Sequence, residues 1–196
     1  YKQLMRSGEI CKISKSASPA ILTLEQEEIL IGSMLGDGCI FKHPKSKYPY
    51  FYVARKMDDL EYLEYEFQIF RDFCNQSEVK IIDIVDKRNE RKYQQCKFVT
   101  RASVVFDSYH KQWYNTIKIL PSDLKLTPLI CAIWFCDDGN VSRNKTCNTI
   151  KFKLATHCFT FEENQRLADM LKAMFQEHFG VGHDNGNHFI FASDSG

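Results

Sequence analysis

The sequence predicts an α+β protein made of two copies of one helix–strand–strand–helix–strand–strand unit. Three observations predict this class. The same order of elements occurs twice along 196 residues, each copy opens with a helix that is apolar almost all round, and each of these helices ends in an aspartate, Asp37 or Asp138. Internal repeats are the signature of duplicated architectures, and a helix that is apolar all round is buried. We therefore expect these two helices to pack against each other at a pseudo-two-fold axis.

The first copy begins at a capping box. Thr23 and Gln26 have the spacing in which each side chain caps the other's backbone amide, so a helix starts there and runs to about residue 35. Segments rich in Tyr, Phe and Val predict strands, and Leu and Phe at helical spacing predict an amphipathic helix. The remaining expected elements are strands over 39–42 and 48–56, a helix over 58–75, strands over 79–85 and 93–101, and a helix over 103–115.

The second copy begins where Thr127 precedes Pro128, a favoured helix start. Its apolar helix ends in Asp137-Asp138-Gly139. The remaining expected elements are strands near 141 and over 149–156, a helix over about 160–179, and strands over 180–183 and 188–192.

These elements divide the chain into an N-terminal extension (1–22), a first half (23–121) and a second half (122–196). The second half stops at the point where the first continues into its last helix. We therefore expect that its C-terminal helix is missing and that the chain is a fragment, or else that its second centre is impaired.

Composition excludes several classes of protein. The hydrophobic fraction of 44% and the charged fraction of 26% are ordinary for a globular domain, and 26 Lys+Arg against 25 Asp+Glu leave a formal net charge of +1. The sequence contains no run of eighteen apolar residues, and its polar start carries no signal core, so we expect an intracellular protein and no membrane partner. The compartment stays open between organelle, nucleus and cytoplasm. Eight cysteines without a Cys-x-x-Cys pair predict reduced, structural thiols.

The local charges differ from the total. Residues 39–56 hold five basic side chains and residues 140–160 hold four, both without an acid, whereas residues 58–78 hold seven acids and one Arg. The predicted strands are thus basic and the helix over 58–75 acidic. A two-stranded basic ribbon fits the DNA major groove, although a merely solvated charged face is the alternative. The predicted DNA-contacting residues are Lys42, Lys45, Lys47, Arg55, Lys56, Lys87, Arg88, Arg91, Lys92, Gln95, Lys97, Arg101, Arg143, Lys145, Lys151 and Lys153.

Asp37 and Asp138 are the candidate catalytic pair. Either one alone is explained by ordinary Asp-Gly turn chemistry. Two carboxylates at equivalent places in a repeat, converging between basic sheets, would repel each other unless a divalent cation neutralised them. Because Mg²⁺ binds through one or two carboxylates together with water and substrate phosphates, this arrangement points to phosphodiester hydrolysis.

Two segments carry a family resemblance. Leu30–Gly38, LIGSMLGDG, resembles the first motif of the LAGLIDADG homing endonucleases, and Thr127–Gly139, TPLICAIWFCDDG, resembles the second motif of their single-chain branch. The lead-in to the following helix, Phe159–Glu163, is also similar to that branch. The resemblance covers about residues 23–193.

The resemblance implies a fold and an activity. It implies two αββαββα halves, motif helices at the central seam, saddle-shaped antiparallel sheets on double-stranded DNA, and a monomer that cuts both strands of a long asymmetric site with Mg²⁺ to leave 3′ overhangs. It implies that Mn²⁺ substitutes for Mg²⁺ and that Ca²⁺ binds without supporting cleavage. The implied metal-binding residues are Asp37 and Asp138, with Gly36 beside them and Asp137 as second choice. Lys118 resembles the family's active-site lysine, although an exposed loop lysine is the alternative.

Other functions stay open at this point. An intron maturase would bind intron RNA on the same scaffold, and a DNA-binding regulator would have lost catalysis. A Ca²⁺-binding module lacks support, because the sequence has no dense loop of oxygen ligands.

Overall fold

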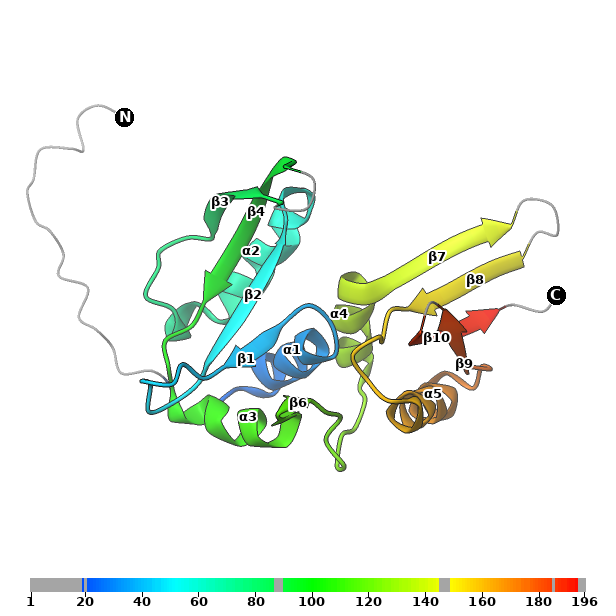
Figure 1. The fold of residues 1–196 in the computed structure, drawn as a ribbon. Helices are drawn as coiled ribbons and strands as arrows, with labels where there is room; N and C mark the ends of the chain where they lie inside the picture. Colours follow the sequence, from blue (N-terminus) through cyan, green and yellow to red (C-terminus); the bar gives the residue numbers. More distant parts are fainter. Residues whose placement is uncertain (1–18, 20, 87–89, 145–148, 185, 194–196) are drawn as a thin grey trace, which may run out of the picture.

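The computed structural model describes residues 19, 21–86, 90–144, 149–184 and 186–193. Two helices, α1 (Leu24–Leu35) and α4 (Pro128–Asp138), lie side by side at the centre, and one four-stranded sheet stands on each side of them (Figure 1). Within the described part of the chain, no helix is both long and apolar enough to cross a membrane.

The two halves share one order of elements up to their fourth strand, and the first half then continues with further elements. The first half continues from α1 with β1 (Cys39–Phe41), β2 (Tyr50–Lys56), α2 (Leu60–Ile69), β3 (Lys80–Val85), β4 (Lys92–Val99), α3 (Asp107–Trp113) and the short strands β5 (Tyr114–Asn115) and β6 (Ile117–Lys118). The second half continues from α4 with β7 (Gly139–Asn144), β8 (Thr149–Leu154), α5 (Phe161–Phe175), β9 (Gly180–Asp184) and β10 (Asn187–Ser193).

The sheets show that the halves are true repeats. Their strand orders are β1-β2-β4-β3 and β7-β8-β10-β9, antiparallel throughout. Cys39 pairs with Tyr52 in the first sheet, and Asn140 pairs with Lys153 in the second. Both partners are displaced by 101 positions, the spacing of Asp37 and Asp138. The predicted duplicated α+β fold is confirmed.

One glycine in α1 and one directly after it allow the two central helices to meet at the axis. A Cβ placed on Gly32 would come within 2.6 Å of the Ile133 Cβ, and one on Gly36 within 2.4 Å of the Asp137 Cβ. Each of these pairs consists of a residue and its own counterpart 101 positions later. Equivalent positions can touch each other only on a two-fold axis, so the axis runs between α1 and α4.

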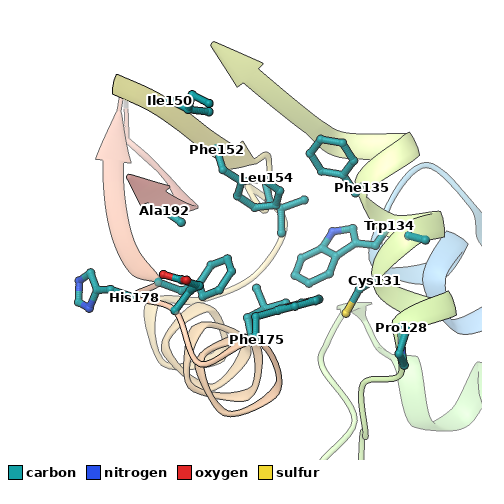
Figure 2. A pocket seen from close by; sticks show the side chains of 14 residues that line it. Pro128, Cys131, Trp134, Phe135, Ile150, Phe152, Leu154, Phe175, His178 and Ala192 are labelled. Atoms are coloured by element: carbon teal, nitrogen blue, oxygen red, sulfur yellow. The ribbon is translucent and has the colours of Figure 1, made fainter. Parts of the chain in front are cut away.

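The cores of the two halves are filled unequally. In the first half, aromatic rings pack under the sheet. The far side is closed by α3, with Trp113 buried, and by the 3₁₀ turn before it, whose Phe106 packs against Phe73. In the second half, the corresponding space is an apolar groove of about 710 Å³ between α4, β8 and α5, with Trp134 and Phe152 on its walls (Figure 2).

Several elements differ from the sequence prediction. The helix expected over 103–115 is reduced to α3, which follows a 3₁₀ turn at Val104–Phe106 and is followed by β5. The helix expected over 58–75 is shorter, because 3₁₀ turns at Met57–Asp59 and Arg71–Phe73 flank α2. Helix α5 ends at Phe175, where Gln176 adopts a left-handed conformation with φ 59°. The hairpin of β5 and β6 was not predicted; its turn places Thr116 at φ 68°, a conformation that side-chain patterning does not reveal.

Candidate active site

Asp37 and Asp138 are held in different ways at the ends of the paired helices. Asp37 follows α1 in a tight turn, in which the Gly36 amide donates to the Gly32 and Ser33 carbonyls and the Gly38 amide donates to Ser33 O at 2.7 Å. Its side chain is 51% exposed. Asp138 is instead the last residue of α4, so the helix itself fixes its backbone, and its side chain is half-buried.

The β5–β6 hairpin brings Lys118 to the Asp37 turn. The Lys118 ammonium donates to the carbonyl oxygens of Gly36 and Gly38, at 3.3 and 3.5 Å. These are the residues on either side of Asp37. Burial lowers the pKa of Lys118 from its ordinary value. The structure thus places the Lys118 ammonium beside the turn that carries Asp37.

The electrostatics of the site show an excess of negative charge. The carboxylates of Asp37, Glu66, Asp137 and Asp138 gather around the helix ends with the cations Arg55 and Lys118, and Asp59 and Lys56 also act on Asp37. Burial, followed by repulsion from Asp37 and Asp137, raises the pKa of Asp138 to about 7. Burial also raises the pKa of Asp37, against the opposing effect of Arg55.

A divalent cation fits this donor set. In the described residues, no three His, Cys, Asp or Glu side chains form a dense ligand cage. Two carboxylates with excess negative charge are nevertheless what Mg²⁺ uses when substrate phosphates complete its coordination. Asp37 and Asp138 are the residues that would hold it.

The structure removes Arg55 from the predicted set of DNA-contacting residues, because its side chain is buried. Its side chain is only 2% exposed, and its Nη1 lies 2.6 Å from Asp137 Oδ1 while its Nη2 lies 2.9 Å from Glu66 Oε2. The prediction failed because it counted charge along β2 without its alternation. Phe51, Val53 and Arg55 all point to the buried face.

The side chain of Asp137 is also placed differently from the prediction that it is a second-choice metal ligand. Its carboxylate is fully buried and accepts hydrogen bonds from the Tyr62 hydroxyl at 3.1 Å and from the Asp37 amide at 3.2 Å, besides its ion pair with Arg55. Asp137 corresponds to Gly36, not to Asp37, and its side chain points across the seam. The solvent does not reach this carboxylate.

The exposed faces of the sheets carry much of the remaining predicted set. In the first sheet, Lys56 pairs with Gln95, and Lys97 pairs with Ala54 on one side and Lys80 on the other, all on one face. In the second sheet, Lys151 and Lys153 point away from the apolar groove, and Lys153 lies 3.8 Å from the Phe189 ring centroid. The exposed Lys42, Lys45 and Lys47 lie at or beyond the end of β1 and before β2, with Lys42 paired to Asp107 at 3.8 Å.

The remaining residues of the predicted DNA-contacting set lie elsewhere. Arg101 donates to the carbonyls of Asp72 and Cys74, which gives it a structural role. Arg143 pairs in register with Ile150, and therefore alternates to the opposite face from Lys151. Arg91 and Lys92 are exposed at the start of β4. Lys87, Arg88 and Lys145 lie outside the described residues.

Arg55 and Asp137 belong to a buried network that also contains Ser33, Tyr62 and Glu66, and sequence reasoning missed these three residues. Ser33 donates to Glu66 Oε1 at 2.9 Å, and the Tyr62 ring lies 4.2 Å from the Arg55 guanidinium carbon. A signal for Glu66 was present. It lies between Leu63 and Phe67 on the apolar face of its helix, where a carboxylate has to find a buried cation.

Comparison with known proteins decides the family. The model of the LAGLIDADG DNA endonuclease family matches residues 27–195. The chain belongs to this family.

Among curated relatives of this LAGLIDADG protein are two cytochrome b mRNA maturases bI2. That of Debaryomyces hansenii is 31% identical over 159 residues, covering 79% of this chain and 58% of the relative. That of Saccharomyces cerevisiae is 30% identical over 155 residues, covering 73% of this chain and 35% of the relative. The chain therefore spans only about a third to a little over half of these relatives.

A solved structure matches the whole fold. The homing endonuclease I-WcaI bound to its DNA recognition sequence superposes with a TM-score of 0.82 at 24% identity, covering 97% of this chain and 86% of that one. This match shows that the LAGLIDADG fold extends over nearly all of the chain.

Proposed function

We propose that this chain is a site-specific endonuclease that hydrolyses both strands of a long, asymmetric DNA site with a divalent cation and leaves 3′ overhangs. The observation that carries the proposal is the pair Asp37 and Asp138, one in each half, at the ends of helices that meet on a pseudo-two-fold axis. A duplex has the same approximate symmetry in its two backbones, so each aspartate can serve one strand. Because one chain contains both halves, we propose that it acts as a monomer.

The sheet faces supply the affinity for DNA. Lys80 and Lys97 lie directly opposite each other on β3 and β4. Like charges in such a pair destabilise a sheet on their own, so their placement supports a polyanionic partner. The exposed Lys56 and the partly exposed Gln95 on the same face can contact phosphates and base edges.

The catalytic roles follow from charge and position. Bound Mg²⁺ would supply an activated water and neutralise charge on the phosphate. Asp37 and Asp138 would hold the cation, which would relieve the repulsion between these carboxylates. The Lys118 ammonium, which is fixed beside Asp37, can stabilise charge that develops on the phosphate. We expect Mn²⁺ to replace Mg²⁺, and Ca²⁺ to bind without supporting cleavage.

The test is cleavage of a plasmid that carries the uninterrupted host-gene sequence, with Mg²⁺ or with EDTA. Asp37→Asn and Asp138→Asn should each abolish double-strand cutting while DNA binding in EDTA stays within about threefold of wild type. Normal cutting by both variants would show that the centres are assigned wrongly.

A maturase that binds intron RNA is the second candidate. It is favoured by the two bI2 maturases among the relatives. Splicing assays with the host intron distinguish the two functions, because a maturase without nuclease activity promotes splicing and leaves the plasmid intact.

A further inference from the structure

The two aspartates are not supported equally by their surroundings. Glu66, Arg55 and Asp137 form an ion-pair bridge across the seam, and the turn that carries Asp37 contacts it twice. Asp137 of the second half accepts a hydrogen bond from the Asp37 amide, and Arg55 of the first half lies 3.7 Å from the Asp37 carboxylate. Arg55 also binds Asp137 and Glu66 directly. The position of Asp37 therefore depends on a contact between halves.

Among the described residues of the second half, the positions equivalent to this bridge carry no ion pair. With the repeat offset of 101 residues, Thr156 is the equivalent of Arg55 and Leu167 is the equivalent of Glu66. The first-half equivalent of Asp137 is Gly36. Thr156 is fully buried and its hydroxyl donates to Asn164, within its own half. Asp138 needs no such support, because it is the last residue of α4.

The two carboxylates of the bridge have several hydrogen-bond donors each, and fully satisfied buried networks of this kind favour a single arrangement. Glu66 accepts from Ser33 and twice from Arg55, and Asp137 accepts from Tyr62, Arg55 and the Asp37 amide. Removing one partner of a buried ion pair leaves the other charges uncompensated, which is far more disruptive than losing an exposed pair. Without Arg55, the Asp137 carboxylate loses its ion-pair partner at 2.6 Å and is no longer held in place, so the Asp37 amide loses a fixed acceptor.

We propose that Arg55 is a positioning residue. It clamps Glu66 of the first half to Asp137 of the second and so fixes the turn that carries Asp37, which makes the Asp37 centre, but not the Asp138 centre, dependent on this bridge. The effect on cleavage rests on the proposed endonuclease function. The effect on the turn does not.

The first experiment needs no activity. Amide hydrogen exchange of the metal-free protein in EDTA is followed by NMR at Asp37 and at Gly38, whose amide donates to Ser33 O in the same turn. Arg55→Gln should lower the protection of Asp37 by roughly tenfold or more and leave Gly38 within about threefold. Arg55→Lys, which keeps the charge, should restore part of the protection.

Thr156→Val is the matched control. It removes a buried hydrogen-bonding group from the equivalent place in the second half. It should lower overall stability without a selective change at Asp37. Preserved protection of the Asp37 amide in Arg55→Gln would overturn the proposal whatever happens to cleavage.

The second experiment resolves the two DNA strands. A target duplex labelled on each strand in turn is cut by wild type, Arg55→Gln and Thr156→Val, and nicking is followed separately. Arg55→Gln should slow one strand at least about tenfold more than the other, so that nicked DNA accumulates, whereas Thr156→Val should show no strand bias. Equal slowing of both strands by Arg55→Gln would overturn the one-sided role.

The two proposals fail separately. If wild type cuts no target, the endonuclease function is wrong, and the exchange experiment still decides whether Arg55 holds the Asp37 turn. If wild type cuts but Arg55→Gln shows neither effect, only the positioning role is wrong.

Discussion

Gly36 and Asp137 are equivalent residues with opposite roles. The glycine leaves room, and the aspartate fills that room with a carboxylate that binds Arg55 across the seam. Two copies of either residue would not work: two aspartates would face each other on the axis, and two glycines would leave Arg55 without Asp137. This pair of residues therefore favours pairing between unlike halves over pairing between like halves.

Lys118 gives a prediction at the residue scale. Lys118→Met keeps the length of the side chain and removes its charge, so we expect cleavage to slow by roughly 10²- to 10³-fold, the usual loss when one stabilising donor is removed. DNA affinity should barely change, because the ammonium donates to the Gly36 and Gly38 carbonyls in a half-buried position. Single-turnover cleavage and binding in EDTA measure the two quantities.

Lys111→Met is the control for this variant. Lys111 is 72% exposed on α3 and pairs only locally with Asp107 among the contacts of its ammonium described in the structure. Its loss should leave cleavage unchanged. If Lys118→Met cuts as fast as this control, Lys118 only supports the Asp37 turn.

At the scale of elements, the α1–α4 seam gives a stability prediction. Gly32→Ala would place a methyl group 2.6 Å from the Ile133 Cβ and 2.9 Å from the Ile130 carbonyl oxygen. Because backbone has to move, we expect a loss of about 1–3 kcal/mol in the free energy of unfolding. Intrinsic helix propensity alone favours alanine over glycine by about 1 kcal/mol, in the opposite direction.

Urea unfolding of the metal-free protein measures this loss. Glu64→Ala, on the exposed side of α2, serves as control and should change the free energy by less than about 0.5 kcal/mol. A stabilised Gly32→Ala protein would mean that the seam is looser than the structure shows.

At the scale of the whole molecule, the distribution of charge matters more than its sum. The net charge of +1 combines basic sheet faces with acidic residues on and around α2. Lys97→Ala should therefore lower the slope of log affinity against log salt by about 1, as expected for one lost phosphate contact. Lys172→Ala, on the outer side of α5, should leave the slope unchanged. DNA-binding titrations at several salt concentrations measure both slopes.

Much of the fold was predictable from local chemistry. The capping residues Thr23, Thr127 and Thr160 all bind the amide three residues on, as their spacing indicates. Along β8, Phe152 and Leu154 line the apolar groove while Lys151 and Lys153 point to the other face, as the alternation of side chains in a strand requires. Short-range patterns of this kind depend on neighbours within a few residues, and a single sequence contains them in full.

Within the site, the two aspartates and Lys118 were predicted as candidates, but the bridge between the halves was not. The repeat spacing of 101 residues and the apolar character of α1 and α4 already determined that the chain folds as two paired halves with Asp37 and Asp138 at corresponding ends. Only the tertiary structure decided that Arg55 is buried, that Asp137 is its ion-pair partner, and that the Asp37 turn contacts both. The physical reason is that a buried charge is defined by partners from other elements, here β2, α2 and α4, whose approach is set by packing at the seam rather than by neighbours in sequence.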